Sequence, residues 1–311
     1  MRRIKTTLPR LAAGLLALSA LPGQAADLGA VDEPIQMAML EWTGNNISVQ
    51  IAGRILEKAG YKVEYVTAGN FPQFTGLSDG SLDASVEIWM MNVGDVYPVA
   101  LESGKIENLG SLGLRSREGW IYTQAVADAC PGLPDWHALM EPACVAALAT
   151  PDTLPNGRFL DYPADWGARS ANMLADNAMP YTAIPAGSEG AMVAELRAAA
   201  ASNQPLLMTF WEPHFVLAEI KVGWVDMPTC DKADTERCIV PPPVEKVVWS
   251  GLKDKWPAAY DILKAYQMNT EDQQAMMLRV SDKGEDMGEV ADEWVATHEA
   301  IWKPWVDAAL Q

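Results

Sequence analysis

The chain has 311 residues, with 41 Asp and Glu against 23 Lys and Arg and a formal net charge of −18. So acidic a surface repels phosphate backbones and anionic lipid head groups, which excludes nucleic acid as an expected partner and disfavours direct binding to a bilayer. The length is near the limit at which a single hydrophobic core stops growing, so we expect more than one lobe.

The first 26 residues have the pattern of a secretory signal peptide. Four basic residues precede an apolar stretch at 11–21, and the small residues Ala25 and Ala26 follow it. An apolar stretch of this length is too short for a membrane-spanning helix. We therefore expect residues 1–26 to be removed on export, and the mature chain to be a soluble protein of the periplasm.

The first half of the chain predicts a β-α-β-α-β order, followed by one more helix and one more strand. The predicted strands are 35–40, 61–66, 82–88 and 120–126, and the predicted helices are 45–59, 71–80 and 94–104. This order is typical of a parallel sheet with right-handed crossovers.

A second α/β pattern follows in the other half of the chain. The predicted strands are 143–149, 206–211 and 244–249, the predicted helices are 168–177 and 188–201, and residues 151–167 are expected to be a loop. The remaining C-terminal residues are expected to be helical. We expect two α/β lobes, with lobe 1 formed by 27–118 and 247–311 and lobe 2 formed by 119–246.

The four cysteines form two closely spaced pairs, Cys130 with Cys144 and Cys230 with Cys238. In an exported chain, two local disulfides are the leading connectivity of the three that are possible. A metal site is the competing interpretation. Neither pair has CxxC spacing or a histidine at ligand spacing, so we expect no metal.

Three of the predicted strands lead to a tryptophan. Trp42 follows strand 35–40, Trp89 follows strand 82–88, and Trp211 ends strand 206–211. Ligands of open α/β sheets bind beyond the carboxyl ends of strands, so the three indoles are expected to converge on one ligand. Indole is also the side chain best suited to a cation that has no N–H to donate.

One motif of the sequence is also compatible with an enzymatic function. The segment Gly76–Gly80 fits the G-x-S-x-G pattern of a hydrolase, with Ser78 as the nucleophile. That motif requires a strand before it and a helix after it, whereas here the strand comes after. The three histidines also lack metal-site spacing. We expect no catalysis and no cofactor, and keep a secreted hydrolase as a remote alternative.

Several motifs together resemble one family. They are Glu41-Trp42-Thr-Gly, Glu87-Ile-Trp89-Met, Trp166-Gly167, Phe210-Trp211-Glu-Pro-His214, and the closing Gly284-Glu, Trp294 and Pro304-Trp305. The chain is similar over its whole mature length to the substrate-binding proteins of ABC importers for glycine betaine, choline and related quaternary amines. The resemblance implies a two-lobed periplasmic binding protein of the type II clamshell class, with a mostly parallel sheet flanked by helices in each lobe. It also implies a monomer that docks on a membrane permease.

The same resemblance implies which residues bind the ligand. Trp42, Trp89 and Trp211 match aromatic-box positions, Trp166 matches the glycine betaine branch, and Trp120 lies where the choline branch has an aromatic residue. The candidates for the polar end of the ligand are His214, the backbone amides near Gly167, and Glu118.

Two features of the sequence favour different ligands. Gly44 stands where the choline branch has an aspartate, and Trp166-Gly167 matches the branch that holds a carboxylate, so glycine betaine or proline betaine is favoured. An ionised Glu118 facing the cleft would instead repel a carboxylate. Choline, trimethylamine N-oxide, carnitine and dimethylsulfoniopropionate therefore remain alternatives.

Overall fold

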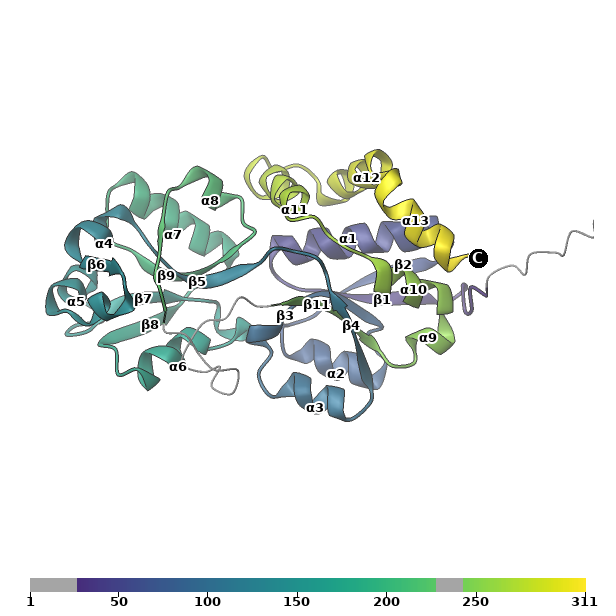
Figure 1. The fold of residues 1–311 in the computed structure, drawn as a ribbon, viewed down its shortest axis with the longest axis horizontal. Helices are drawn as coiled ribbons and strands as arrows, with labels where there is room; N and C mark the ends of the chain where they lie inside the picture. The colour runs from purple at the N-terminus through teal and green to yellow at the C-terminus, as the bar shows by residue number, and fades with distance from the viewer. Residues whose placement is uncertain (1–26, 228–242) are drawn as a thin grey trace, which may run out of the picture.

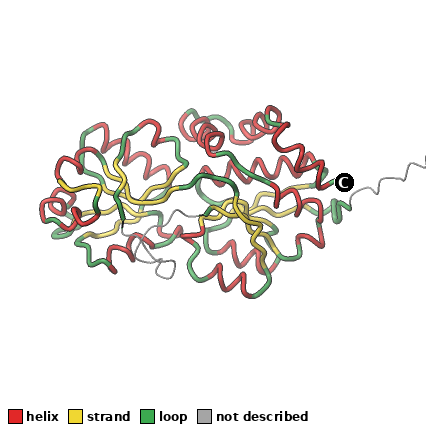
Figure 2. Tube along the Cα trace, viewed as in Figure 1, coloured by secondary structure: helices red, strands yellow, loops and turns green. Residues whose placement is uncertain are grey.

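Residues 27–227 and 243–311 are described by the computed structural model. They form two lobes that lie side by side, each built on a five-stranded sheet (Figure 1). Figure 2 shows helices around the strands of both lobes. The predicted signal peptide and the pair Cys230 and Cys238 lie outside the described residues.

Lobe 1 has the strand order β2-β1-β3-β11-β4. Its strands are β1 (Pro34–Met39), β2 (Lys62–Thr67), β3 (Ala84–Trp89), β4 (Ile106–Ser111) and β11 (Val244–Trp249). Its helices are α1 (Thr43–Lys58), α2 (Pro72–Asp79), α3 (Val96–Glu102), α9 (Leu252–Lys255), α10 (Pro257–Ala265), α11 (Thr270–Met277), α12 (Met287–Thr297) and α13 (Glu299–Ala309). Short 3-10 and π turns, η1 (Met90–Asn92) and η4 (Leu278–Asp282), complete it.

Lobe 2 has the strand order β10-β5-β9-β7-β8. Its strands are β5 (Arg117–Tyr122), β7 (Gly157–Asp161), β8 (Tyr181–Pro185), β9 (Leu207–Glu212) and β10 (Gly223–Trp224), and the short β6 (Pro131–Pro134) lies outside the sheet. Its helices are α4 (Gln124–Ala129), α5 (Pro142–Leu148), α6 (Arg169–Asp176), α7 (Glu189–Ala201) and α8 (Val216–Glu219), with 3-10 turns η2 (Trp136–Met140) and η3 (Ala164–Trp166).

Each sheet has four strands in one direction and one strand reversed. The reversed strand is β11 in lobe 1, which pairs antiparallel with β3 and β4, and β5 in lobe 2, which pairs antiparallel with β9 and β10. The other pairings are parallel. The prediction of two mostly parallel α/β lobes is confirmed.

Each reversed strand pairs within its own sheet from its first residue. β5 already pairs with β9 at Arg117, and β11 already pairs with β3 at Val244. The strands therefore support lobe boundaries a few residues earlier than the expected 118/119 and 246/247. We propose that residues 117–118 belong to lobe 2, and that 244–246 belong to lobe 1.

Two predicted elements in lobe 2 were wrong. Residues 143–149 were predicted as a strand but form α5, which has Pro142 in its first turn and buries Cys144, Val145 and Leu148 on one helical face. The expected loop 151–167 instead contains β7. The first error arises because a seven-residue apolar run has no periodicity that separates a strand from a helix. The second arises because β7 has only two large apolar side chains, Phe159 and Leu160, beside the charged Arg158 and Asp161.

The predicted disulfide between Cys130 and Cys144 is confirmed, and it links the end of α4 to α5. No helix within 27–227 and 243–311 is long and apolar enough to cross a membrane. The same residues contain no group of His, Cys, Asp or Glu side chains arranged to hold a metal ion.

Helix α13 lies at the end of lobe 1 remote from lobe 2 (Figure 1), and its Trp302 belongs to the hydrophobic core. It is 7% exposed, and its Nε1 donates to the carbonyl of Val295 at 2.8 Å. We expect Trp302→Ala to lower the free energy of unfolding by about 3 kcal/mol or more, because a buried indole leaves a large cavity. Urea unfolding checks this. A ligand affinity that fell along with stability would place Trp302 in the binding site instead.

Candidate ligand-binding site

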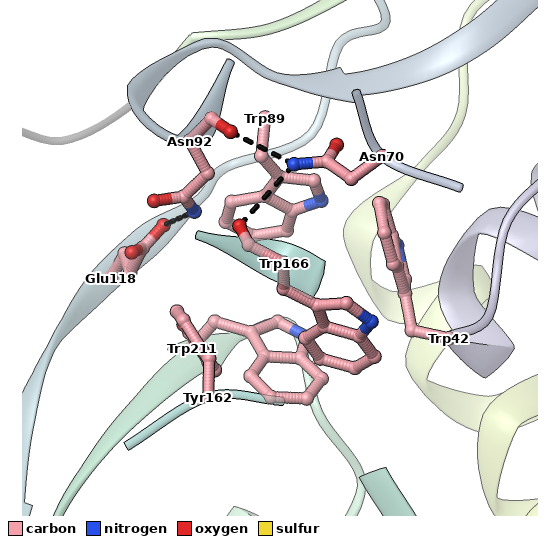
Figure 3. A pocket seen from close by; sticks show the side chains of 8 residues that line it. All are labelled: Trp42, Asn70, Trp89, Asn92, Glu118, Tyr162, Trp166 and Trp211. Carbon is pink, nitrogen blue, oxygen red and sulfur yellow. Dashed lines mark hydrogen bonds between the residues drawn. The ribbon is translucent and has the colours of Figure 1, made fainter. Parts of the chain in front are cut away.

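A cavity lies between the two lobes. Each lobe contributes four of the side chains that line it (Figure 3). Those of lobe 1 are Trp42, Asn70, Trp89 and Asn92, and those of lobe 2 are Glu118, Tyr162, Trp166 and Trp211. A molecule in this cavity touches both lobes at once.

The aromatic side chains of the cavity come from the carboxyl ends of parallel strands. Trp89 is the last residue of β3, Trp42 follows β1, Tyr162 follows β7, and Trp211 lies near the end of β9. The parallel strands of one lobe point the same way, so their ends meet at one edge of its sheet. The predicted convergence of Trp42, Trp89 and Trp211 is therefore seen in the structure.

Trp166 is the centre of the aromatic cluster. Its ring centroid lies 5.3 Å from that of Trp42, and 5.7 Å from those of Tyr162 and Trp211. Tyr162 and Trp211 are also 5.7 Å apart. The planes are inclined by 48° to 72°, so edges meet faces. We call Trp42, Trp89, Tyr162, Trp166 and Trp211 the aromatic box.

A buried carboxylate fixes the lobe 1 half of the box. Oε1 of Glu87 accepts from the indole N–H of Trp42 at 2.9 Å and from that of Trp89 at 3.2 Å. Its Oε2 accepts from Ser48 and Gln273, both at 2.7 Å. Burial raises the pKa of Glu87, and these four hydrogen bonds oppose that shift. Four donors and no acceptor suit an ionised carboxylate.

The lobe 2 half of the box is held partly from lobe 1. The indole N–H of Trp166 donates to Oε2 of Glu41 at 3.1 Å, and Asn70 Nδ2 donates to the Trp166 carbonyl at 3.2 Å. Both bonds cross between the lobes, so these two contacts of Trp166 require the lobes to be closed.

Glu118 supplies a titratable group to the cavity wall. Its Oε2 accepts from Asn92 Nδ2 at 2.9 Å, and only 4% of the residue is exposed. Burial raises the pKa of Glu118 to about 7, against the opposing effects of the Arg169 guanidinium and of the hydrogen bonds from Asn92 and Tyr162. In Figure 3, Glu118 and Asn92 lie together at one side of the cavity, and Trp42 lies at the other.

Three predicted site residues do not line the cavity. Trp120 is fully buried in lobe 2, where it packs on Phe159 at 4.7 Å, because it pairs with Thr209 and so lies two residues deeper than Glu118, which pairs with Trp211. His214 is fully buried behind Trp211. Gly167 lines a neighbouring depression together with Asn92 and Arg169.

Three cavity residues were not predicted. Tyr162 was missed because β7, which positions it, was taken for a loop. Asn70 and Asn92 follow β2 and β3 by a few residues, in turns where an asparagine is common for conformational reasons alone. Asn70 and Asn92 could have been predicted only from their position after strands whose carboxyl ends face the cleft.

Ser78 of the G-x-S-x-G motif lies inside α2. A nucleophile elbow places its serine at a sharp turn between a strand and a helix, so this segment does not form one.

Two α/β lobes that enclose an aromatic box define a solute-binding protein of the clamshell class. The match to a known family is extensive, since residues 33–297 match the substrate-binding domain of ABC-type glycine betaine transport systems, OpuAC. The chain belongs to this family, whose members are solute-binding proteins rather than enzymes.

Individual relatives differ in what they bind. A protein of Pelagibacter ubique (strain HTCC1062) called a trimethylamine N-oxide-binding protein is 28% identical over 285 residues, which cover 88% of this chain and 90% of that one. The structure of lactococcal OpuAC in its closed form with glycine betaine has a TM-score of 0.71 at 20% identity. The match covers 90% of this chain and 100% of that one. A choline-binding protein solved with choline has a TM-score of 0.74 at 18% identity, covering 88% and 92%. At such identities the two structures support the fold alone.

Proposed function

We propose that this protein captures a compact trimethylammonium compound whose polar end is a single oxygen, with trimethylamine N-oxide as the leading candidate. The observation that carries this proposal is the position of Glu118 and Asn92 at one side of a cavity that is otherwise mostly aromatic. The Pelagibacter relative, which matches along most of both chains, supports the same ligand class.

The aromatic box suits the trimethylammonium end. Such a group has no N–H, carries a diffuse positive charge and cannot be recognised by hydrogen bonds. Each ring face contributes about 0.5 to 2 kcal/mol, with the larger value where water is excluded. A micromolar affinity needs about 8 kcal/mol, so the rings supply a large part and the polar end supplies much of the rest.

The polar wall favours an oxide over a carboxylate. The expectation of a betaine assumed that Glu118 faces solvent and that amides near Gly167 hold the ligand carboxylate. Glu118 instead lines the cavity, and Gly167 does not. A protonated Glu118 can donate one hydrogen bond to an oxide oxygen, whereas an ionised one repels any anionic group. We therefore place trimethylamine N-oxide ahead of glycine betaine, proline betaine and carnitine.

The proposal also covers where the protein works and what it delivers its ligand to. The leader at residues 1–26 exports the chain to the periplasm, where it works as a monomer and delivers its ligand to a membrane permease. The family supports an extracytoplasmic role in an ABC importer.

Calorimetric titration at pH 6 and pH 8 tests the assignment. With a pKa of about 7, Glu118 is mostly protonated at pH 6 and mostly ionised at pH 8. If the N-oxide binds only the protonated form, its affinity should fall about tenfold between these pH values. Choline, a cation without an oxide, should bind more tightly at pH 8, because the carboxylate then attracts it.

Glu118→Gln is the matched variant, because its amide N–H₂ donates at either pH. It should keep N-oxide affinity and lose the pH dependence. Glycine betaine or choline binding at least tenfold more tightly than the N-oxide at pH 6 would contradict the proposal. So would a pH dependence that survives in Glu118→Gln.

A further inference from the structure

Helix α1 begins without a side-chain cap of its own. Its N-cap residue is Trp42, which makes no capping hydrogen bond because an indole has no acceptor for a backbone N–H, and its ring lines the cavity. The first amides of a helix have no intrahelical partner and need an acceptor from elsewhere. A ligand-contacting residue thus occupies a position that usually holds Ser, Thr, Asp or Asn.

The acceptor comes from the other lobe. Glu189 is the first residue of α7 in lobe 2, and its Oε2 accepts from the backbone N–H of Thr43 at 2.9 Å and from the Thr43 hydroxyl at 2.7 Å. Glu189 is only 9% exposed. A carboxylate at this place also complements the positive end of the α1 dipole.

His214 orients Glu189. Its Nε2 lies 3.1 Å from Oε1 of Glu189, and its Nδ1 accepts from the backbone N–H of Val216 at 3.2 Å. Since Nδ1 is an acceptor, Nε2 carries the proton and donates it to the carboxylate. His214 also packs edge-to-face on Trp211, with centroids 5.0 Å apart. His214, which the sequence predicted to bind the ligand, therefore contacts Trp211 of the aromatic box and Glu189.

We propose that Glu189 is a positioning residue that stabilises the closed form by capping α1 across the cleft. Its partner Thr43 is next to Trp42, and its neighbour His214 contacts Trp211. A ligand that aligns the two indoles also aligns the two halves of the cap. When the lobes separate, Glu189 and Thr43 part and both return to water, so the cap favours closure by a difference between the two forms.

The kinetic consequence is specific. Ligand enters the open form, in which the cap is absent, and leaves the closed form only after the cap breaks. Loss of Glu189 should therefore raise the dissociation rate constant and leave the association rate constant nearly unchanged.

The test is stopped-flow indole fluorescence with trimethylamine N-oxide and with glycine betaine, on the mature protein and its Glu189→Ala variant. We expect the dissociation rate constant to rise about tenfold, in line with hydrogen bonds to a charged group. The association rate constant should stay within about twofold. Thr43→Val, which keeps the backbone N–H and loses the hydroxyl, should show a smaller rise.

Two matched controls isolate the cap. Glu195→Gln changes a carboxylate on the same helix whose partner, Arg158, is within lobe 2, and it should leave both rate constants unchanged. Asp282→Asn breaks an exposed ion pair with Arg197 that also crosses the lobes, and it should have little effect because exposed pairs contribute little. The melting temperature of ligand-free Glu189→Ala should fall, because the buried Nε2–H of His214 loses its acceptor, so the rate constants are compared at a temperature where both proteins are folded.

The inference rests on the proposed solute-binding function, and a second readout separates the two. Single-molecule FRET between dyes on one exposed position of each lobe measures the closed fraction without ligand, which Glu189→Ala should lower several-fold. If neither compound binds the unaltered protein, the proposed ligand class is wrong. The closed fraction measured by FRET then shows by itself whether Glu189 stabilises the closed form. The role of the cap would be overturned if Glu189→Ala left the dissociation rate constant or the closed fraction unchanged. It would also be overturned if Glu195→Gln changed them as much as Glu189→Ala.

Discussion

Trp211→Ala should weaken ligand binding by about 30-fold or more and leave the lobes folded. Trp211 lines the cavity, and its ring lies against Trp166 and Tyr162. Removing it deletes one ring face in a dry site, which is worth about 2 kcal/mol or about 30-fold. It also frees the two rings that it supports. Calorimetric titration measures the affinity, and circular dichroism with thermal melting reports on the fold.

Trp120→Phe is the matched control for this substitution. Trp120 lies on the neighbouring strand β5, pairs with Thr209, and donates to Ser170 at 3.0 Å inside lobe 2. The control should lower stability, because it removes a buried hydrogen bond and leaves space in the core, and it should leave affinity unchanged. Normal binding by Trp211→Ala, or unfolding of that variant, would show that the box assignment is wrong.

Glu87→Ala should damage stability and binding together. It leaves the indole N–H groups of Trp42 and Trp89 without their common acceptor, along with donors on Ser48 and Gln273. Buried donors without partners cost about 1 to 3 kcal/mol each, so the free energy of unfolding should fall by at least about 3 kcal/mol. Affinity should fall at least tenfold, because two box rings lose their fixed orientation.

Urea unfolding and calorimetric titration measure the two effects of Glu87→Ala. Glu107→Ala is a control in the same lobe, since Glu107 accepts from Tyr260 at 2.6 Å and does not line the cavity. It should change affinity little. Glu87→Gln should be intermediate, because an amide oxygen can still accept from the indoles while its N–H₂ faces two donors. A Glu87→Ala variant that lost stability but bound normally would show that Glu87 does not orient the box.

Much of the fold and three of the five box residues followed from local patterns. The strands that end near Trp42, Trp89 and Trp211 have clear apolar runs with turns after them, whereas Trp166 was identified only by the resemblance to the glycine betaine branch of the family. These features are encoded within about ten residues of each site, so one sequence contains them. The disulfide of Cys130 with Cys144 followed from spacing in the same way.

What could not be predicted depends on register and on contacts between distant segments. Glu118 and Trp120 share one face of β5, and only the pairing of that strand with β9 decides which of them reaches the cavity. Tyr162 was hidden by the wrong assignment of β7. The pairing of Glu189 with Thr43 joins residues far apart in sequence, and His214 contributes through that pair.

The asymmetry between the two halves of the box sets an order of events. Trp42 and Trp89 are held by Glu87, and all three residues belong to lobe 1. We therefore expect this half of the box to keep its geometry when the lobes are apart. Tyr162, Trp166, Trp211 and Glu118 all belong to lobe 2 and withdraw together when it swings away. A ligand bound as we propose then keeps the rings of Trp42 and Trp89 and loses the other three, together with its contact to Glu118. Separation of the lobes thus lowers the affinity for the ligand in a single motion. Release of the ligand then needs no chemical change at the site.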